Sequence, residues 1–291
     1  MNEFKNYHPF VNLVYFMLVT GFSCIFMNPL CLVISLFCAL SYLWVLKGRK
    51  ALKTMLFTLP LIILMAIINP LFSHNGETVL MYFKNGNPLT LESIIYGGCA
   101  AIMIWSVICW FSCFNQVMTS DKIIYLFGKI LPSLSLVISM TLRFVPRFIE
   151  ETKKISVAQK CMGNDVAEGK FKDKVINASA VLSATVTKEL ENSVETADSM
   201  KARGYGLKGR SAYHNFKFTK KDFIWLSFIT VCGGTVISGG INGVLKFSFF
   251  PSLSVLEFST AGVMVFSAYF ILCVVPVIIE IREVRRWKAS K

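Results

Sequence analysis

Charged residues are scarce in this chain and are missing from several long stretches. Asp, Glu, Lys and Arg make up only 16% of the 291 residues, whereas 54% are hydrophobic. Such a balance lies outside the range of ordinary soluble domains. A bilayer core of ~30 Å needs about 20 apolar residues in a helix, so each long uncharged stretch can span a membrane. Five stretches contain no charged side chain: 9–46, 54–72, 93–116, 223–245 and 258–279.

The sequence also lacks the motifs of several catalytic classes. It contains neither HExxH nor GxxxxGK[ST], which excludes a zincin site and a nucleotide-binding loop of its own. The three histidines, His8, His74 and His214, lie outside the uncharged stretches. Ionisable groups within membranes mark ion pathways, proton relays and catalysis. Their absence here argues against a proton-coupled carrier, an intramembrane protease or a metal channel, and we expect no cofactor, metal site or enzymatic activity.

The nine cysteines lie mostly within the uncharged stretches and show no CxxC spacing. Apolar packing is therefore favoured over disulfides or metal binding. Asn28-Pro29, at the middle of the first stretch, is a turn signal that divides it into two helices. The predicted fold is an all-α polytopic membrane protein with about six transmembrane helices and additional cytosolic amphipathic helices. The six predicted spans are 10–27, 29–46, 54–72, 93–115, 223–245 and 257–280.

The distribution of positive charge predicts the orientation of the chain. If both termini are cytoplasmic, 28 of the 30 lysines and arginines fall on the cytoplasmic side. That is the bias of the positive-inside rule. The net charge of +13 is then explained by topology and by attraction to anionic lipid, and nucleic acid is not expected as a partner.

A long basic region separates the membrane segments, which suggests three parts: 1–116, 117–221 and 222–291. The middle part begins with an apolar segment that Lys129, Arg143 and Arg147 interrupt. An amphipathic helix at the membrane interface fits this pattern better than a further span. Prolines 132 and 146 are expected to break the segment, with Pro146 bending the chain into a second helix.

The second helix is predicted to end at Gly163 and Asn164, and a third to run from about 174 to 203. One apolar stripe follows the third helix: Val175, Leu182, Val186, Leu190, Val194, Ala197 and Met200. Its early face carries small residues that would allow another helix to approach closely: Ala178, Ser179, Ala180, Ser183, Ala184 and Thr185. By periodicity alone, the region is a helical hairpin that packs on itself.

Four motifs together are similar to the T component of energy-coupling factor (ECF) transporters. They are "HPFVNLV" at 8–14, "NPLFSHNGETVL" at 69–80, "LRFVPRFIEE" at 142–151 and "SMKARGYG" at 199–206. The resemblance implies a scaffold in the bacterial cell membrane that joins two ABC-type ATPases to a substrate-binding S component. It also implies that the scaffold itself neither hydrolyses ATP nor holds the vitamin or metal. Cytosolic coupling helices in this family end in Ala-Arg-Gly motifs that dock into grooves on the ATPases.

Ala202, Arg203 and Gly204 match the second such motif, with Arg203 as a multi-donor group at a helix tip. The first motif departs from the pattern, because Cys161, Met162 and Gly163 stand where Ala-Arg-Gly is expected. We therefore predict asymmetric docking, electrostatic at Arg203 and apolar at Met162, with help from Lys160.

The residues alone leave alternatives open. Arg203 could be no more than a cation near a helix C-terminus, a position worth ~0.3–1 kcal/mol. The whole chain could be a membrane anchor for an unrelated cytosolic complex, or an enzyme acting on lipid head groups. An enzyme would need a cluster of ionisable side chains, and Asp165, Glu168 and Asp173 are scattered among lysines. The sequence does not identify the transported substrate. It also leaves open whether the transporter module is shared by several vitamins or dedicated to one vitamin or metal.

Overall fold

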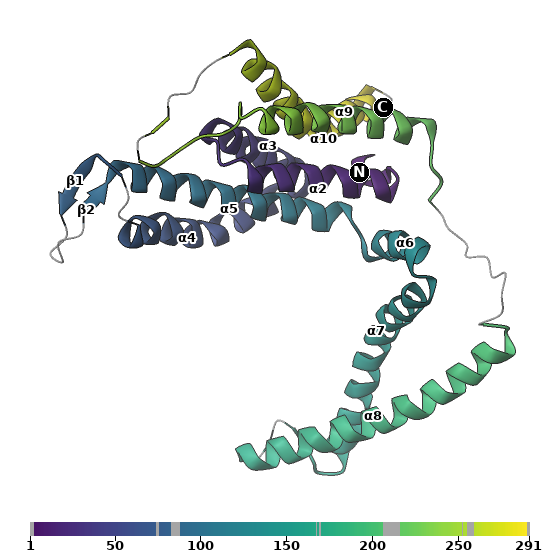
Figure 1. Ribbon diagram of the computed structural model, residues 1–291. Helices are drawn as coiled ribbons and strands as arrows, with labels where there is room; N and C mark the ends of the chain where they lie inside the picture. The colour runs from purple at the N-terminus through teal and green to yellow at the C-terminus, as the bar shows by residue number, and fades with distance from the viewer. Residues whose placement is uncertain are drawn as a thin grey trace. The chain divides into compact units, whose positions relative to one another are not determined.

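The computed structural model describes residues 3–73, 76–82, 88–166, 168, 170–205, 216–251, 253–254 and 259–289. His74 and His214 lie outside these residues. The described chain is helical apart from one antiparallel pair of strands, β1 (Val79–Tyr82) and β2 (Pro88–Thr90) (Figure 1). The helices are α1 (Glu3–Asn6), α2 (Pro9–Ile25), α3 (Pro29–Lys47), α4 (Arg49–Phe72), α5 (Leu91–Val117), α6 (Ser120–Ile130), α7 (Pro132–Cys161), α8 (Phe171–Ala202), α9 (Lys220–Ile241) and α10 (Thr260–Ala289).

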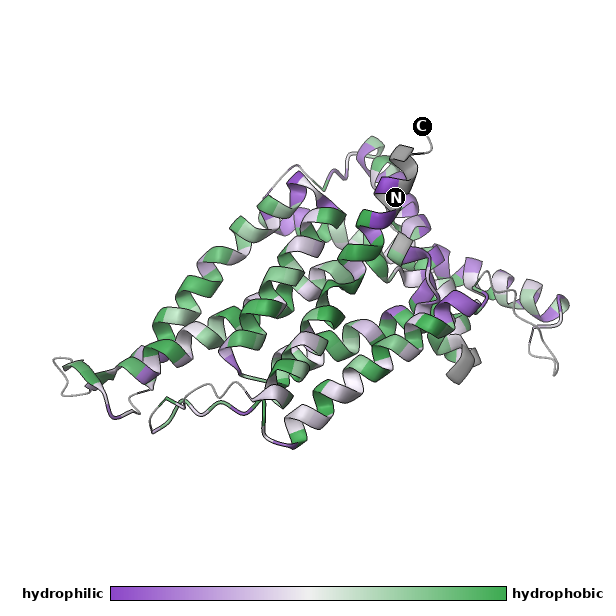
Figure 2. Ribbon diagram, turned by 90° about the horizontal axis from the view of Figure 1, so that it is seen from above, coloured by the Kyte–Doolittle hydropathy of each residue, from purple (hydrophilic) through white to green (hydrophobic). Residues whose placement is uncertain are grey.

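The predicted all-α polytopic fold is confirmed. Among the described residues, five helices are long and apolar enough to cross a membrane, namely α3, α4, α5, α9 and residues Thr260–Arg282 of α10. The remaining predicted span corresponds to α2, an apolar helix of 17 residues. These helices are hydrophobic over most of their length (Figure 2).

The last predicted span, 257–280, ends in an ionisable residue, Glu280, whose side chain is 1% exposed. The candidate span in α10 extends to Arg282 and also includes this residue. Glu280 accepts a hydrogen bond from the backbone N–H of Phe4 at 3.3 Å. Burial of this carboxylate is compatible with the fold because the N-terminal segment supplies a donor.

The break between α2 and α3 follows directly from Asn28-Pro29. Asn28 is the N-cap of α3, and its side chain accepts a hydrogen bond from Leu30 N at 3.1 Å. Pro29 occupies the first helical position, where a missing N–H leaves no hydrogen bond unmade. The predicted turn at this point is confirmed.

The chain divides into two compact units. Residues Met1–Lys122 and Phe216–Lys291 form the membrane unit, and Ile123–Asn215 form the hairpin unit. In the membrane unit α5 packs against α2, α3 and α4, and α10 packs against α3 and α9. Its core contains fully buried aromatic side chains, among them Tyr15, Tyr42 and Trp110.

Four polar side chains in this core form hydrogen bonds with one another. Trp110 Nε1 donates to Ser35 Oγ at 3.0 Å, and Ser35 lies 2.7 Å from Ser23 Oγ. Ser23 Oγ in turn is 3.1 Å from the Tyr269 hydroxyl. Four side chains from α2, α3, α5 and α10 thus share one hydrogen-bonded chain, which removes the cost of burying each polar group alone.

Glycines allow α9 to approach its neighbours closely. A Cβ at Gly239 would lie 2.5 Å from a methyl carbon of Val265 in α10, and one at Gly233 would lie 3.1 Å from Leu18 in α2. Gly234 has open space instead. Glycine therefore permits close helix contact at positions 233 and 239, whereas position 234 has room for a side chain.

The N-terminal segment is anchored inside the membrane unit. Phe4 is 2% exposed and packs edge-on against Tyr15 and Tyr42. Lys122, on the first turn of α6, donates a hydrogen bond from Nζ to the backbone oxygen of Lys5. Burial, with the neighbouring positive charge of Lys5, lowers the pKa of Lys122 to about 8. Residues 3–6 therefore connect the first turn of α6 to the end of α10.

The motif at residues 8–14 forms a joint between two helix starts. Pro9 begins α2, and the His8 side chain accepts a hydrogen bond from Phe10 N at 3.3 Å. The backbone N–H of His8 donates to Asp222 Oδ1 at 3.0 Å. Asp222 also accepts from Thr219 in the capping box that begins α9. These residues therefore have a structural role in joining α2 to α9.

The motif at residues 69–80 lies where α4, β1 and α5 meet. Pro70 is buried, and a Cβ at Gly97 of α5 would lie 3.0 Å from its ring. Glu92 Oε1, on the first turn of α5, accepts hydrogen bonds from the N–H of Thr78 at 3.3 Å and from its hydroxyl at 2.6 Å. These contacts hold the strand pair on α5, which favours a structural interpretation of this segment.

Within the hairpin unit, the expectation for Pro146 is wrong. The chain breaks at Leu131, as Pro132 predicted, but α7 then continues through Pro146 to Cys161. A proline inside a helix loses one backbone hydrogen bond and commonly kinks the helix. The side chains of Phe144 and Phe148, on either side of Pro146, are half-buried, and α7 packs against α8. Packing of α7 against α8 offsets the backbone hydrogen bond that Pro146 cannot make. The second helix therefore begins at Pro132 and not at Pro146, as was expected.

We predict that Gly239→Ala destabilises the membrane unit by about 1–3 kcal/mol, because the added methyl group overlaps Val265. Thermal unfolding in detergent would measure this as a lower Tm. Gly234→Ala is the matched control and should leave the Tm unchanged or raise it, since alanine favours helix. The double variant Gly239→Ala/Val265→Ala should recover part of the loss. Equal Tm values for the two single variants would contradict the close contact.

Candidate docking site at the ends of α7 and α8

Helix α8 ends in a hydrogen-bonded glycine cap. Gly204 has a φ of +75°, a left-handed conformation that costs residues with a Cβ roughly 1–2 kcal/mol. Gly204 N donates to Lys201 O at 3.0 Å, and Tyr205 N donates to Met200 O at 3.1 Å. These two bonds define a Schellman motif, with Arg203 as the last residue before the glycine.

Helix α7 ends in the same way. Gly163 has a φ of +87°, its N–H donates to Lys160 O at 3.0 Å, and Asn164 N donates to Gln159 O at 3.0 Å. Met162 is the residue before this glycine, the position that Arg203 holds in α8. The first motif, which lacks the arginine, therefore has the same backbone conformation as the second. The two motifs differ only in their side chains.

The predicted docking residues of both motifs are accessible. Ala202 and Arg203 are exposed at the end of α8, as are Cys161 and Met162 at the end of α7. Met162 leaves 64% of its surface uncovered, so this apolar side chain is available for contact. Each helix thus ends in an exposed side chain of different chemistry, cationic at Arg203 and apolar at Met162.

Lys160 already has a partner within the chain. Its Nζ lies 2.7 Å from Asp165 Oδ2, and the hydrogen bond with this carboxylate raises the pKa of Lys160. The backbone oxygen of Asp165 also accepts a hydrogen bond from Asn177 Nδ2 at 3.0 Å. Lys160 therefore helps to hold the loop after α7 against α8, in addition to the docking role expected for it.

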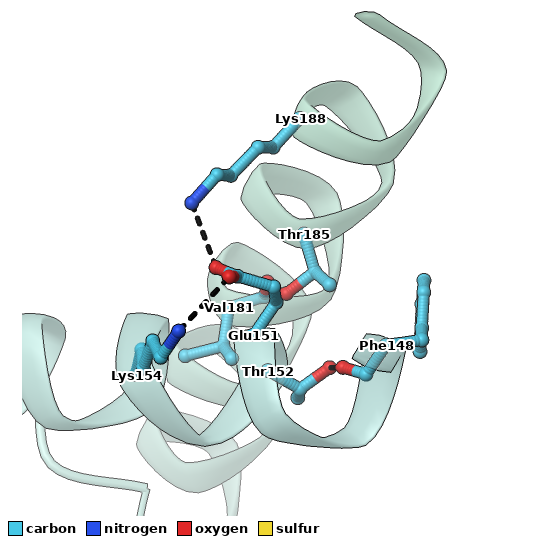
Figure 3. Close-up of polar contacts among 7 residues, drawn as sticks. All are labelled: Phe148, Glu151, Thr152, Lys154, Val181, Thr185 and Lys188. Carbon is cyan, nitrogen blue, oxygen red and sulfur yellow. Dashed lines mark hydrogen bonds and ion pairs between the residues drawn. The ribbon is translucent and has the colours of Figure 1, made fainter. Parts of the chain in front are cut away.

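The two helices cross at a buried contact with a charged rim. Val181 and Thr185 of α8 are buried at 5% and 0% exposure. Beside them the Glu151 carboxylate accepts hydrogen bonds from Lys188 Nζ at 2.7 Å and from Lys154 Nζ at 3.1 Å (Figure 3). These bonds hold the pKa of Glu151 below its ordinary value of 4.5. The crossing fixes the directions in which the two capped helix ends point relative to one another.

The face of α8 that packs inward is not its apolar stripe. The buried and half-buried positions recur with helical period: 174, 177, 181, 185, 189, 192, 196 and 200. Most of the predicted stripe is exposed instead, with Leu190 and Val194 each 63% accessible. The prediction that α7 and α8 form a hairpin is correct, but the hairpin leaves an apolar surface uncovered along α8.

No local sequence pattern indicates which face of α8 packs inward. Thr185 at the crossing belongs to the predicted small-residue face, but Glu151 and Lys188 are 37 residues apart and share no motif. Within the described part of the chain, no three His, Cys, Asp or Glu side chains gather as metal ligands would. The chemistry that the site offers is recognition by exposed side chains on a rigid backbone.

Fold and site together define the class of this protein: a polytopic membrane protein that carries a long helical hairpin with two glycine-capped, exposed ends. The chain matches the family described as cobalt transport protein (CbiQ) over residues 5–213. It therefore belongs to that family and is a membrane component, the T component, of ECF-type transporters.

Individual relatives agree with this assignment. The chain is 32% identical over 111 residues to the "Energy-coupling factor transporter transmembrane protein EcfT" of Bacillus selenitireducens, covering 38% of this chain and 41% of that protein. It is 38% identical over 90 residues to the protein of the same name in Bacillus subtilis, covering 31% and 34%. An uncharacterized protein of Mycoplasma pneumoniae, an MG181 homolog, is 27% identical over 205 residues, covering 61% and 47%. The matched segments span less than half the length of these curated relatives.

We predict that Glu151→Gln loosens the crossing of α7 and α8, because both lysines lose their charged acceptor. Hydrogen–deuterium exchange at the amides of residues 181–189 should become several-fold faster. Glu150→Gln, a neutralisation at the adjacent exposed residue, is the matched control and should leave exchange unchanged. Identical protection in the two variants would mean that the ion pairs do not stabilise the crossing.

The same carboxylate predicts a pH dependence. Because the pKa of Glu151 is lowered in the folded state, its stabilisation is complete above the ordinary pKa of 4.5 that the carboxyl has in the unfolded chain. It is lost as the pH falls through the lower, folded value. Protection of the crossing, after correction for intrinsic exchange rates, should therefore fall below about pH 4 in the native chain and change less in Glu151→Gln. A pH profile that is the same in both proteins would contradict this.

Proposed function

We propose that the chain is the scaffold of an ECF-type importer and couples ATP hydrolysis by two partner ABC-type ATPases to uptake of a micronutrient. The substrate, a vitamin or a transition metal, would be held by a separate S component. Family membership supports the transporter context, and the two capped helix ends supply the surface through which ATPases would act. The chain itself then transmits motion.

The single observation that carries this proposal is the equivalence of the two helix ends. A transporter driven by two ATPases needs one contact for each, and α7 and α8 end in the same Schellman geometry with an exposed residue before the glycine. Such an end is held rigidly by its own backbone bonds. A force that an ATPase exerts on the side chain at that position would therefore be transmitted along the helix to the crossing of α7 and α8, because the helix end would not fray.

The contact at α8 is electrostatic. Arg203 carries a permanent charge and a planar fork of donors that suits bidentate binding of a carboxylate. Ala202 beside it is small and exposed, which permits close approach of a groove wall. Arg203 is thus suited to enter an acidic groove on one ATPase.

The contact at α7 is apolar. Met162 is flexible and polarizable and can fill an irregular hydrophobic groove. Cys161 adds a second small apolar group, and Gly163 keeps the turn tight. The two ATPases would thus be held by different forces, electrostatic at one end of the hairpin and hydrophobic at the other.

The apolar helices support a multi-pass membrane protein, and we propose that its membrane is the bacterial cell membrane. We infer from the positive-inside bias that both termini and the hairpin unit are cytoplasmic, where ATPases are available. The exposed apolar surface of α4, most of whose residues are uncovered in the membrane unit, would face lipid or the S component.

Arg203→Ala is expected to weaken ATPase binding by about 2–5 kcal/mol, the range for truncating one partner of a buried charge pair. Met162→Ala should cost less, because only apolar area is lost. The test is co-purification of the tagged chain with the two ATPases encoded in the same genome, together with uptake in reconstituted vesicles. Lys201→Ala, a neighbouring exposed cation, is the matched control.

Each outcome of this experiment is informative. Loss of ATPases with Arg203→Ala alone supports docking and its asymmetry. Equal losses for Arg203→Ala and Met162→Ala would contradict the asymmetry but not the scaffold. If the native chain binds neither ATPase, the scaffold proposal is wrong.

Replacing the glycine caps tests the role of the backbone. Gly204→Val forces a β-branched residue into a left-handed conformation, at a cost of roughly 1–2 kcal/mol or more. The last turn of α8 should open and ATPase binding should fall although Arg203 is intact. Gly204→Asn is the control, since asparagine tolerates this conformation. Full binding by Gly204→Val would show that the rigid cap is not required.

A further inference from the structure

A basic pocket lies between the first half of α7 and the second half of α8. Its volume is about 350 Å³. Three arginines and three apolar side chains account for most of its lining: Arg143, Arg147, Arg203, Met140, Phe144 and Met200. Arg143 and Arg147 lie one turn apart on α7, and Arg203 reaches the same pocket only because α8 crosses α7. The sequence pattern alone could not bring Arg203 to the other two.

The charges in this pocket are not neutralised within the described part of the chain. No carboxylate is among the residues that line it, and none of the three guanidinium groups forms an ion pair there. A smaller adjoining hollow of about 290 Å³ shares Arg147 and Arg203 and has Glu195 on its wall. The three guanidinium groups carry like charges, and no residue that lines the pocket relieves the repulsion among them. An anion with several acceptor oxygens would relieve it.

The surroundings of the pocket indicate which anion is available. From residue 122 to residue 149 the chain has four basic residues and no acidic one. Several of its apolar side chains are exposed on α7, including Leu134, Val137 and Val145. Exposed apolar residues together with basic ones are typical of helices that lie at the surface of an anionic membrane.

We propose that this pocket binds the phosphate headgroup of an anionic phospholipid. Arg143 and Arg147 would donate to the phosphate oxygens, and Arg203 would contribute from the opposite helix. Met140, Phe144 and Met200 would contact the glycerol and the first carbons of the acyl chains. A bound lipid would then tie α7 to α8 at a second point, away from the Glu151 crossing. The proposal rests on the interfacial position that the sequence predicts for α7, and not on ATPase docking.

Lipid binding to the purified, delipidated full chain tests this by native mass spectrometry. The probes are phosphatidylglycerol and phosphatidylcholine with identical acyl chains. We expect the first phosphatidylglycerol to bind tightly, and Arg143→Gln/Arg147→Gln to weaken it by about tenfold or more. Lys153→Gln/Lys172→Gln removes two exposed charges from the same unit outside the pocket, and should change the affinity by no more than about twofold.

Three results would overturn the proposal. Equal binding of the two lipids would show that headgroup charge is not recognised, and native affinity in Arg143→Gln/Arg147→Gln would show that the lipid binds elsewhere. Displacement of the first lipid by an equal concentration of inorganic phosphate would show that the pocket recognises free phosphate instead of a lipid.

ATPase co-purification separates this site from the docking site. Arg143→Gln/Arg147→Gln should still bind the ATPases, which would also show that the hairpin is folded, whereas Arg203→Ala should lose them. If the double variant loses the ATPases and retains native lipid affinity, the pocket holds an acidic segment of the ATPase and the lipid proposal is wrong. If the native chain binds no ATPase but shows the lipid preference, only the docking proposal fails. Amide exchange at residues 181–189 then verifies the fold of the variant.

Discussion

The left-handed glycine at the end of each long helix is the constraint on which the hairpin depends. Gly163 and Gly204 let α7 and α8 stop within a single residue, and the Schellman bonds satisfy the last carbonyls without help from another segment. A longer, frayed end would hide or disorder the preceding side chain. The position of Met162 and Arg203 is therefore set by backbone geometry, and the identity of each side chain is free to vary. This explains how the first motif can lose its arginine and keep its place in the structure.

Features encoded by local patterns could be predicted from the sequence. Uncharged stretches, Asn28-Pro29 and the glycines of the two motifs each act within a few residues, and the helices, the turn and the caps follow from them. The continuation of α7 through Pro146 could not be predicted, because the local penalty of a proline is offset by packing of α7 against α8, a helix distant in sequence. The inward face of α8 and the arginine pocket were missed for the same reason. Both depend on the crossing of α7 and α8, which no local period encodes.

Ionisable residues of the membrane unit are few, and several buried ones connect helix ends. Asp222 joins the starts of α2 and α9, Glu280 binds the N-terminal segment from α10, and Lys122 binds the same segment from α6. Each buried charge has backbone partners, which is the condition under which such burial is tolerated. Because Lys122 lies on the first turn of α6, the N-terminal segment connects that turn to α10. Displacement of α6 would therefore break bonds at the N-terminus before it could disturb the apolar core.

The docking site and the basic pocket require different orientations of the Arg203 side chain. In the docking proposal its guanidinium leaves the end of α8 to meet a carboxylate, whereas in the pocket it turns toward Arg143 and Arg147. One side chain cannot make both contacts at full strength, because its donors form a single planar fork. A lipid phosphate held by Arg143 and Arg147 would nevertheless reduce the repulsion that these two residues exert on Arg203. Filling the pocket would thus lower the electrostatic cost of keeping a third cation at the helix end, and the two sites would be coupled through charge, with no rearrangement of the backbone.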